Sequence, residues 1–495
     1  MKHKILLLLF ILLVTLSGYT KVENNVDHIS IMHSISSRTI YQNILELCKD
    51  KYEGRLTGTN GFNMSAEWVI SKLEKWGLKS AGDRGTWLQK FENPYTLVKP
   101  GSSAVLHLPV AGGKTINKNY IYQDDFMAGS TSDTGKVTAE VVYVGFGITA
   151  PELDFDEYKG LDVKGKIVLM EREAPLSPDK NPEKFEKWIK YSLHQYKVKN
   201  AVKHGAAGMI YNYRIANPNC TFIKGLVLTY VGGEVIPDIF TGLQYDHKTV
   251  VSKIRKNLKP FSFNTGKIMT ISNITEHHPE GIASNVLGKI EGRKSNEIIV
   301  VSAHLDHVGK NYEVIPGAND NASGVAVIMS VAKALSDLKE KPERTILFAF
   351  FGAEEQGVKG SEIFLKKLSS DKKIVACINL DGVGMGDKIH ALAGTNYPKL
   401  FEYFKRSNKM YIHRTLTTSY FGNHGRPRLD ASHFMWRKIP SISFSAYGKP
   451  LPYSVYHKTL DRPELLTPEI MEDLARIIFL SLHDMMYGDQ KLLEF

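Results

Sequence analysis

Hydrophobic residues recur with different periods in different parts of the chain, and the change of period divides it into two kinds of structure. Residues 66–76 carry apolar side chains at helical spacing, a pattern that predicts an amphipathic helix. From residue 106 to about residue 263 the pattern changes to short β-like runs separated by turn-rich, acidic pieces. This part of the chain predicts a separate β-rich module with a small core of its own.

Strands and helices alternate from residue 283 onward. Apolar runs predict strands, some of them covered on both faces, at residues 298–303, 346–351, 374–380 and 442–444. Helical spacing of apolar residues predicts helices at residues 324–338 and 470–486. This alternation favours a central α/β sheet, in which binding sites lie beyond the carboxyl ends of the strands. A length of 495 residues also favours two domains, because single cores usually stop growing at about 250–300 residues.

The first residues have the pattern of an export signal. Lys2 and Lys4 precede an apolar run over residues 5–16, and small residues follow it. The run is shorter than the roughly 20 residues that a spanning helix needs and matches the apolar region of a signal peptide. We therefore expect a signal peptide over residues 1–20, cleavage near residues 17–20, and a periplasmic or extracellular protein without stable membrane insertion. The alternative is an uncleaved membrane anchor.

Cysteine content and charge change this picture little. Three cysteines, Cys48, Cys220 and Cys377, provide no disulfide framework. The net charge of +11 comes from Lys and Arg residues that are spread along the chain, commonly beside acids. We expect no nucleic-acid partner, since no recognised binding motif or stacking platform accompanies these charges. The oligomeric state stays open.

Three of the predicted strands lead into residues that commonly bind metals. His304 and Asp306 follow the first strand, Glu354 and Glu355 follow the second, and Asp381 follows the third. Two loops add one candidate each: Asp320 in GANDNASG and His457 in YHKTLD. Five ligands drawn from such His, Asp and Glu residues would suit two zinc ions that each keep an open coordination position.

The spacing of these residues suggests separate roles. His304 and Asp306 are two apart, so on a strand both side chains point the same way. The Asp306 carboxylate could then accept a hydrogen bond from the imidazole N–H that faces away from a metal. Glu354 and Glu355 are adjacent and point apart, which lets one bind metal while the other takes a proton. Asp320 precedes a helix start, where a short carboxylate can bridge two ions.

Each of these signals is weak when taken alone. A single HxDH sequence more often ends a strand than binds a metal, and a Glu-Glu pair is usually part of a solvated surface. Asp381 alone could cap a strand, and His457 alone could be an exposed loop residue. The appearance of all these residues together and in this order is what indicates a metal site.

The motifs AHLDHVG, GANDNASGVA, FGAEEQGVKGS, NLDGVG and YHKTLD resemble five blocks of the zinc exopeptidase family that includes bacterial leucyl aminopeptidases and glutamate carboxypeptidases. The segments GKVTAEVVYVGFGI, LDVKGKIVLM and HGAAGMIYN resemble a protease-associated domain. The resemblance implies an α/β fold with a central mixed sheet flanked by helices and an inserted β-rich protease-associated domain. It places the two parts of the peptidase domain at residues 28–105 and 271–495, the second with the metal site, and the insert at residues 106–270.

The resemblance also implies the roles of individual residues. Two zinc ions would be held by His304 and Asp381, by Glu355 and His457, and by Asp320 as a bridge between them. A water between the ions would be the nucleophile, with Glu354 as the general base.

Two further roles are implied for residues close to these ligands. Asp306 would orient the site, and Tyr456 would steady the tetrahedral intermediate. The family's usual second acid after the bridging aspartate is Asn321 here. In the segment LDASHF, where the family often has Ser-Asp-His, the roles of Asp430, Ser432 and His433 stay open.

The expected function is an exported dinuclear zinc aminopeptidase that hydrolyses amino-terminal residues from peptides. A carboxypeptidase of the same family, a glutaminyl cyclase-type transferase with one zinc and a non-catalytic binding ectodomain are the alternatives. The insert would serve either as a lid that controls substrate access or as a purely structural part.

Overall fold

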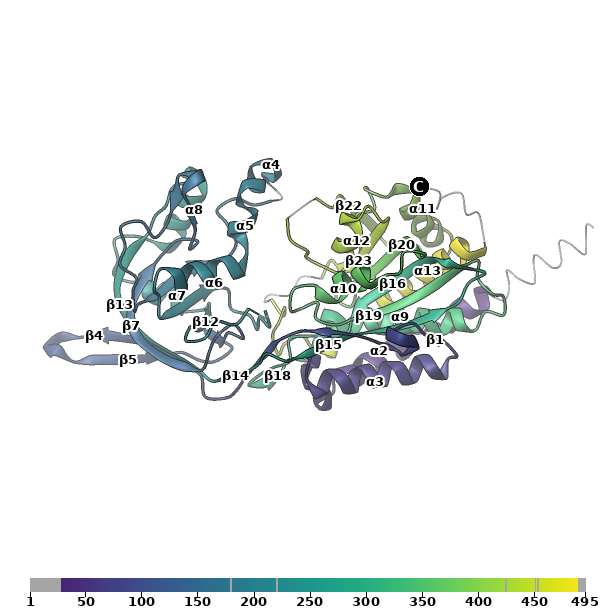
Figure 1. The fold of residues 1–495 in the computed structure, drawn as a ribbon, viewed down its shortest axis with the longest axis horizontal. Helices are drawn as coiled ribbons and strands as arrows, with labels where there is room; N and C mark the ends of the chain where they lie inside the picture. The colour runs from purple at the N-terminus through teal and green to yellow at the C-terminus, as the bar shows by residue number, and fades with distance from the viewer. Residues whose placement is uncertain are drawn as a thin grey trace, which may run out of the picture.

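The computed structural model describes residues 28–487, apart from residues 179, 220, 423, 424, 450, 452 and 453. The expected signal peptide, residues 1–20, lies outside the described residues. The chain forms two units side by side, a helix-flanked sheet and a β-rich unit drawn in blue and teal (Figure 1). Among the described residues, no helix combines the length and the apolar character needed to cross a membrane.

The larger unit is built on a nine-stranded mixed sheet. Its four central strands, β19, β16, β20 and β23, are parallel to one another, whereas β15 and β21 flank them in antiparallel pairing. The strands in spatial order are β1 (Lys79–Ser80), β15 (Ile282–Ile290), β19 (Arg344–Phe351), β16 (Lys294–His304), β20 (Lys373–Leu380), β23 (Ser441–Tyr447), β21 (Lys388–Leu392) and β22 (Leu416–Ser419), and β2 (Leu88–Glu92) also pairs with β15. The expected mixed sheet is therefore confirmed.

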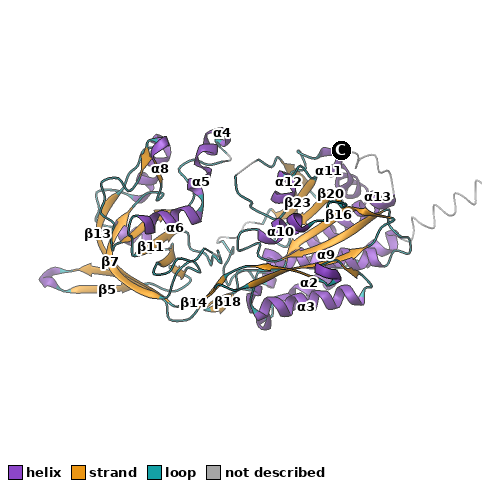
Figure 2. Cartoon of the chain, viewed as in Figure 1, coloured by secondary structure: helices purple, strands orange, loops and turns teal. Residues whose placement is uncertain are grey.

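Helices cover both faces of this sheet (Figure 2). Alternate residues of β16 face opposite ways: Ile299 and Val301 join a core that includes α9 (Ser323–Ser336) and α13 (Pro468–Tyr487), whereas Ile298 and Val300 join one that includes α10 (Lys359–Lys367) and α12 (Ala431–Trp436). Every residue of β19 is buried, which explains why its sequence is apolar without alternation. The other helices of the unit are α2 (Ser37–Leu47), α3 (Asn60–Lys75) and α11 (Pro398–Ser407).

The predicted elements of the larger unit are confirmed, with shifted ends. The helix expected at residues 66–76 begins earlier, at Asn60. The Thr59 side chain accepts a hydrogen bond from the Phe62 N–H, so a threonine cap of the preferred kind starts the helix. The helix starts in the Gly/Thr/Asn-rich segment that the sequence shows ahead of the apolar stripe.

The smaller unit has an eight-stranded sheet and hydrophobic cores separate from the core of the larger unit. In spatial order its strands are β5 (Thr115–Asn119), β4 (Ser103–Pro109), β13 (Phe263–Asn273), β7 (Gly135–Tyr143), β10 (Ile167–Glu171), β11 (Gly208–Asn212), β12 (Val227–Val231) and β6 (Phe126–Ala128). Its helices are α4 (Pro182–Phe185), α5 (Ile189–Ser192), α6 (His194–Lys203), α7 (Val235–Phe240) and α8 (His247–Asn257), and a small β8–β9 pair spans Thr149–Ala150 and Phe155–Asp156. We refer to this unit as the insert.

A four-stranded sheet joins the two units where the chain enters and leaves the insert. It contains β14 (Thr275–His278), β3 (Tyr95–Val98), β17 (Lys310–Asn311) and β18 (Glu313–Val314), in that spatial order. Strands β17 and β18 follow closely after the His304 segment of the larger unit. The base of the insert is thus connected to a loop that carries predicted metal ligands.

Candidate metal centre

Three predicted site segments meet at one edge of the main sheet. His304 is the last residue of β16 and pairs in register with Phe351, the last residue of the neighbouring β19. Leu380 ends β20 on the other side of β16, directly before Asp381. The carboxyl ends of parallel strands therefore converge here, as expected for a site of this fold class.

Buried polar groups fix the loops between these strands. Arg55, which is fully buried, donates hydrogen bonds to the carbonyls of Leu305, Pro316 and Gly317 and so ties the His304 segment to the Asp320 loop. At Gly317, with φ +59°, an added Cβ would lie 2.4 Å from the ring of His307. Only glycine fits this close approach without displacing the loop.

Asp461 fixes the Asp320 loop from the other side. Its carboxylate accepts the backbone N–H of Asn319 at 2.8 Å and that of Asp320 at 3.0 Å. Burial raises the pKa of Asp461 to about 6. The sequence analysis gave Asp461 no role, although it is the last residue of the YHKTLD motif.

The five predicted ligands come together in two groups that share Asp320. His304, Asp320 and Asp381 form one group, and Asp320, Glu355, His457 and the additional residue His307 form the other. His304 Nε2 lies 3.2 Å from Asp320 Oδ1 and 3.7 Å from Asp381 Oδ1. His457 Nε2 lies 2.8 Å from Glu355 Oε2 and 3.5 Å from Asp320 Oδ2.

The donor atoms fit metal ions better than they fit one another. Within the described part of the chain, the buried Nε2 of His457 has no partner with hydrogen-bond geometry, in spite of the carboxylate oxygens around it. The candidate ligand atoms of its group, one from each residue, all lie within 4.8 Å of one another. Imidazole nitrogen and carboxylate oxygen are the ligand types that zinc takes in catalytic sites.

Strong electrostatic coupling links the imidazoles and the carboxylates in the absence of a metal. Burial alone would lower the pKa of His304, but hydrogen bonds to Asp320 and Asp381 raise it well above its usual value. Burial would likewise lower the pKa of His457, which Glu355 and Asp320 raise to about 10. The reverse holds for Glu355: burial would raise its pKa, but the charge of His457 and hydrogen bonds from His307 and His457 together lower it to about 2. A metal cation would take the place of these protons.

Glu354 has a different environment from its neighbour Glu355. Among the described residues, no hydrogen-bond partner engages the Glu354 carboxylate, and its backbone N–H donates to Asp306. Burial and the nearby charges of Glu355, Asp381 and Asp430 raise its pKa well above the usual value. Glu354 belongs to neither ligand group, and its carboxylate holds a proton readily. Such a group is suited to general acid–base catalysis.

The structure corrects the predicted contact of Asp306. His304 Nδ1 donates to the backbone carbonyl of Asp306 at 3.1 Å, whereas the Asp306 carboxylate lies 3.8 Å away. Because β16 ends at His304, the alternation of strand side chains does not extend to Asp306. Its carboxylate instead accepts the N–H groups of Glu354 and Glu355, both at 3.2 Å. Asp306 thus positions the Glu354 segment, while its carbonyl orients the imidazole.

His307 is a site residue that the sequence analysis did not single out. Its side chain is fully buried, and its Nδ1 donates to Glu355 Oε1 at 2.8 Å. This leaves Glu355 Oε2 on the side of His457. The signal in the sequence was the second histidine of HLDH, directly after the two residues that were assigned roles.

Tyr456 lies over His457, with ring centroids 3.7 Å apart and an interplanar angle of 23°. Removal from water and the carboxylates of Glu355 and Asp320 raise the pKa of its hydroxyl well above the usual value. The hydroxyl therefore stays protonated and can act as a donor. Tyr456 remains 47% exposed, so a substrate could reach it.

The residues of LDASHF have structural contacts around the site. Asp430 is buried, and burial raises its pKa to about 6. Ser432 accepts a hydrogen bond from the Arg428 N–H, and His433 Nε2 donates to the carbonyl of Val358, in the segment that follows Glu355. The side chains of Ser432 and His433 thus each form a hydrogen bond with a backbone group, and neither residue belongs to a ligand group.

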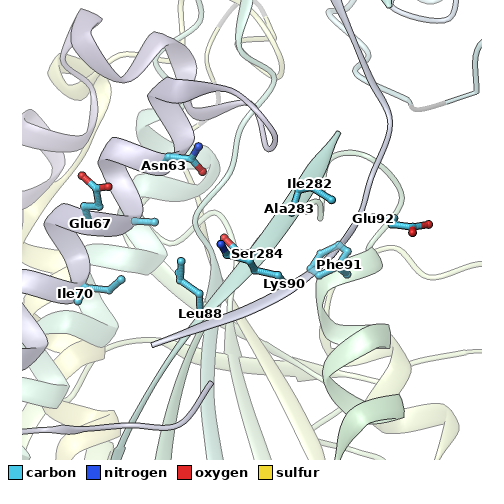
Figure 3. A pocket seen from close by; sticks show the side chains of 11 residues that line it. Asn63, Glu67, Ile70, Leu88, Lys90, Phe91, Glu92, Ile282, Ala283 and Ser284 are labelled. Carbon is cyan, nitrogen blue, oxygen red and sulfur yellow. The ribbon is translucent and has the colours of Figure 1, made fainter. Parts of the chain in front are cut away.

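A separate cavity of about 620 Å³ opens between α3 and the strands β2 and β15 (Figure 3). Asn63, Glu67 and Ile70 line it from the helix, and the strands contribute residues that include Phe91 and Ile282. None of its lining residues belongs to either ligand group. The cavity is therefore not part of the candidate metal centre.

Comparisons with known proteins show which families the two units resemble. Residues 285–482 match the family model described as peptidase family M28, and residues 137–233 match the PA domain. An aminopeptidase of Pseudomonas aeruginosa is 28% identical over 340 residues, which cover 67% of this chain and 54% of that protein. Leucine aminopeptidase 2 of Trichophyton rubrum is 34% identical over 122 residues, 24% of this chain and 23% of that protein. The chain thus spans about half the length of the first of these curated relatives.

Solved structures share the fold across both units. An aminopeptidase from Aneurinibacillus sp. strain AM-1 aligns with a TM-score of 0.64 and 21% identity over 92% of this chain and 95% of that chain. A zinc aminopeptidase from Bacillus subtilis aligns with a TM-score of 0.61 and 20% identity over 92% and 96% of the two chains. The expected resemblance is confirmed: residues 285–482 of the larger unit are similar to peptidase family M28, and residues 137–233 of the insert are similar to the PA domain. We refer to the larger unit as the M28 domain.

Proposed function

We propose that this chain is a zinc aminopeptidase with two metal positions that share Asp320. The observation that carries the proposal is the convergence of the two ligand groups next to Glu354, a carboxylate that no ligand group uses. A dinuclear site needs a bridging ligand, and Asp320 presents Oδ1 to His304 and Oδ2 to His457. His304 and Asp381 would hold one ion, and Glu355 and His457 the other.

The residues of the chain divide the chemistry of peptide hydrolysis among them. When bound, zinc would polarise the scissile carbonyl and activate a water molecule for attack. Glu354 accepts the proton of that water at its carboxylate and passes it to the leaving amine. The Tyr456 hydroxyl donates a hydrogen bond to the oxyanion that forms in the transition state. Asp306 keeps Glu354 in place through the backbone N–H groups of the Glu354–Glu355 pair.

The choice of aminopeptidase over carboxypeptidase rests on the relatives. The proteins from Pseudomonas aeruginosa, Aneurinibacillus and Bacillus subtilis are all described as aminopeptidases. The test is a panel of amino-acid p-nitroanilides and of peptides with free or acetylated amino termini, each measured with and without a chelator. We expect cleavage only of substrates with a free amino group, and loss of activity with the chelator that zinc restores.

The panel separates the alternatives as well. Residue release from the carboxyl end of amino-blocked peptides would indicate a carboxypeptidase. Cyclisation of amino-terminal glutamine with one zinc per chain would indicate a glutaminyl cyclase-type transferase. A protein that binds two zinc ions and cleaves no substrate would be a binding ectodomain, and the aminopeptidase proposal would then be abandoned.

We also propose that the protein is exported. The basic start, the apolar run at residues 5–16 and the small residues after it support this proposal. Expression of the full chain in a bacterial host, followed by amino-terminal sequencing of the periplasmic protein, should find a new terminus near residues 17–20. Retention of the intact chain in the membrane fraction would instead support the uncleaved anchor.

A further inference from the structure

The insert contacts the loops that carry the metal ligands. Met127 and Ala216 of the insert form a buried apolar cluster with Val308 and Ile315 of the M28 domain. Val308 directly follows His307, and Ile315 precedes the Asp320 loop. The insert is therefore packed against two segments of the candidate metal centre.

Polar and aromatic contacts extend this junction. The rings of Tyr122 and Tyr312 stack with centroids 3.7 Å apart. Thr459 Oγ1, two residues after the ligand His457, donates to Gln123 Oε1 at 2.9 Å. The junction thus reaches both the segment after His307 and the segment around His457.

One contact goes directly to a metal ligand. His457 Nδ1 lies 2.8 Å from the carbonyl oxygen of Ala216, and the Ala216 N–H donates to the His457 carbonyl at 3.2 Å. A carbonyl oxygen can only accept, so Nδ1 carries a proton, and Nε2, which faces Glu355 and Asp320, is the nitrogen left to bind a metal once the ion has displaced its proton. A backbone group of the insert therefore fixes both the tautomer and the orientation of this ligand.

The backbone of His457 makes this support more important. Its φ of +54° lies in the left-handed region, which a non-glycine residue keeps only when its surroundings hold it there. The two hydrogen bonds to Ala216 are contacts of this kind. Without them, the His457 loop would be free to adopt more favourable backbone angles that turn the imidazole away from Glu355.

The other ligand group does not depend on the insert in this way. His304 Nδ1 donates to the carbonyl of Asp306, two residues further along the same segment. Asp381 directly follows β20 in the main sheet, and its backbone N–H donates to Phe444. Among the described residues, His304 and Asp381 thus take these hydrogen bonds from the larger unit, whereas His457 takes its hydrogen bonds from the insert.

We propose that docking of the insert controls metal affinity at the Glu355–His457 position and leaves the His304–Asp381 position unaffected. Ala216 is then a positioning residue that acts through its backbone. Coupling of this kind is reciprocal, so metal binding at the Glu355–His457 position also holds the insert against the M28 domain. The inference rests on metal binding at the proposed site, and it gives the insert a role beyond those of lid or structural part.

The first test measures zinc binding to the full chain by competition with a chromogenic chelator. Ala216→Leu enlarges a buried side chain against Val308 and Ile315 and so should push the two units apart. Ala206→Leu makes the same change at a buried alanine that packs inside the insert's own core. We expect Ala216→Leu to weaken one of two zinc positions about 10–100-fold, the range seen when ligand-orienting partners are lost, and Ala206→Leu to weaken neither.

The affected position is identified in an Asp381→Ala background, which disables the His304–Asp381 position. Adding Ala216→Leu to this background should lower the remaining zinc affinity by the same factor. Equal weakening of both positions by Ala216→Leu, or no weakening of either, would overturn the inference while leaving the proposed function intact. Failure of the unmodified chain to bind zinc would overturn the proposed function itself.

Hydrogen exchange of the unmodified chain provides a second test that needs no folded Ala216 variant. Zinc should slow exchange at residues 213–219, which include the Ala216 N–H, and should leave β10 and β11 in the insert unchanged. The effect should persist in Asp381→Ala and disappear in His457→Ala. Protection of residues 213–219 that does not respond to zinc would contradict the proposed coupling.

Discussion

Glu354 and Glu355 are neighbours in the sequence with opposite electrostatic surroundings. The His457 charge lowers the pKa of Glu355, whereas burial and adjacent carboxylates raise that of Glu354. The same two residues in a solvated helix would have nearly equal pKa values. The difference arises because the Glu355 side chain lies among the imidazoles of His307 and His457 and that of Glu354 does not.

This difference predicts the effect of Glu354→Gln. The amide preserves the shape of the side chain but cannot take a proton, so we expect kcat to fall by at least about 10²-fold, in line with general-base contributions. Zinc content should stay at the unmodified level. The matched control is Glu340→Gln, at a half-exposed glutamate outside both ligand groups, which should leave kcat within experimental error. Substantial peptidase activity in Glu354→Gln would refute the role of Glu354.

His307 should contribute to metal binding without being a ligand of the proposed pair. His307→Leu removes the donor to Glu355 Oε1, and we expect zinc affinity to fall about 10–100-fold, as for other residues that orient a ligand. His307→Asn places an amide N–H near the original Nδ1 and should retain most of the affinity. Chelator competition on both variants measures the difference. Equal zinc affinities of His307→Leu and the unmodified chain would show that this hydrogen bond does not support the site.

At the level of the elements, the sequence was most informative where periodicity and parallel strands act together. Largely apolar runs identify β19 and β20 as buried strands, and parallel strands bring their carboxyl ends to one edge. For this reason His304, Glu355 and Asp381 could be placed together without a structure. The place of Asp320 directly before a helix start also suggested a carboxylate that can bridge two ions, and the structure places Asp320 in both ligand groups.

The contacts that the sequence did not reveal are those set by loops and by backbone groups. The predicted bond from His304 to the Asp306 carboxylate was wrong because it required the strand to continue past His304. Ala216 could not be found at all, since an alanine in a loop carries no chemical signature and acts through its carbonyl. Loop geometry that depends on the meeting of distant segments has no local pattern for the sequence to show.

Within the insert, a buried acid makes stability depend on pH. Glu157 Oε2 accepts the N–H groups of Phe146 and Ile148, and burial raises the pKa of this carboxyl from 4.5 to about 8. The folded insert therefore holds a proton that the unfolded chain releases. The stabilisation is complete below pH 4.5 and is lost as the pH rises toward 8.

Glu157→Gln removes this titration and keeps an oxygen acceptor for the two N–H groups. We expect the variant and the unmodified chain to differ little in unfolding free energy at pH 5. At pH 7.5 the unfolding free energy of the variant should exceed that of the unmodified chain by up to about 3 kcal/mol relative to that baseline, given 1.36 kcal/mol per pKa unit. Urea unfolding of the two proteins at both pH values measures this change. A difference that stays constant with pH would mean that Glu157 is ionised in the folded insert.

At the scale of the whole molecule, two units with separate cores meet beside one candidate metal site. The main core and the cores of the insert contain no residue in common. Each unit can therefore fold and unfold largely on its own. All the proposed ligands belong to the M28 domain. Zinc should therefore stabilise that domain directly and the insert only through the junction at Ala216.

Tryptophan fluorescence can follow the M28 domain alone. Trp188 lies in the core of the insert, whereas Trp68, Trp76, Trp87 and Trp436 lie outside it, so Trp188→Phe leaves emitters only in the larger unit. Zinc at 100 times its Kd should raise the unfolding free energy of this unit by about 2.7 kcal/mol for each position that it fills, because the folded state binds the ion and the unfolded state does not. In a His457→Ala and Asp381→Ala double variant the fluorescence transition should not respond to zinc, since both ligand groups are then incomplete. A transition that shifts with zinc as much in the double variant as in the unmodified site would place the stabilising ion somewhere other than at the edge of the main sheet.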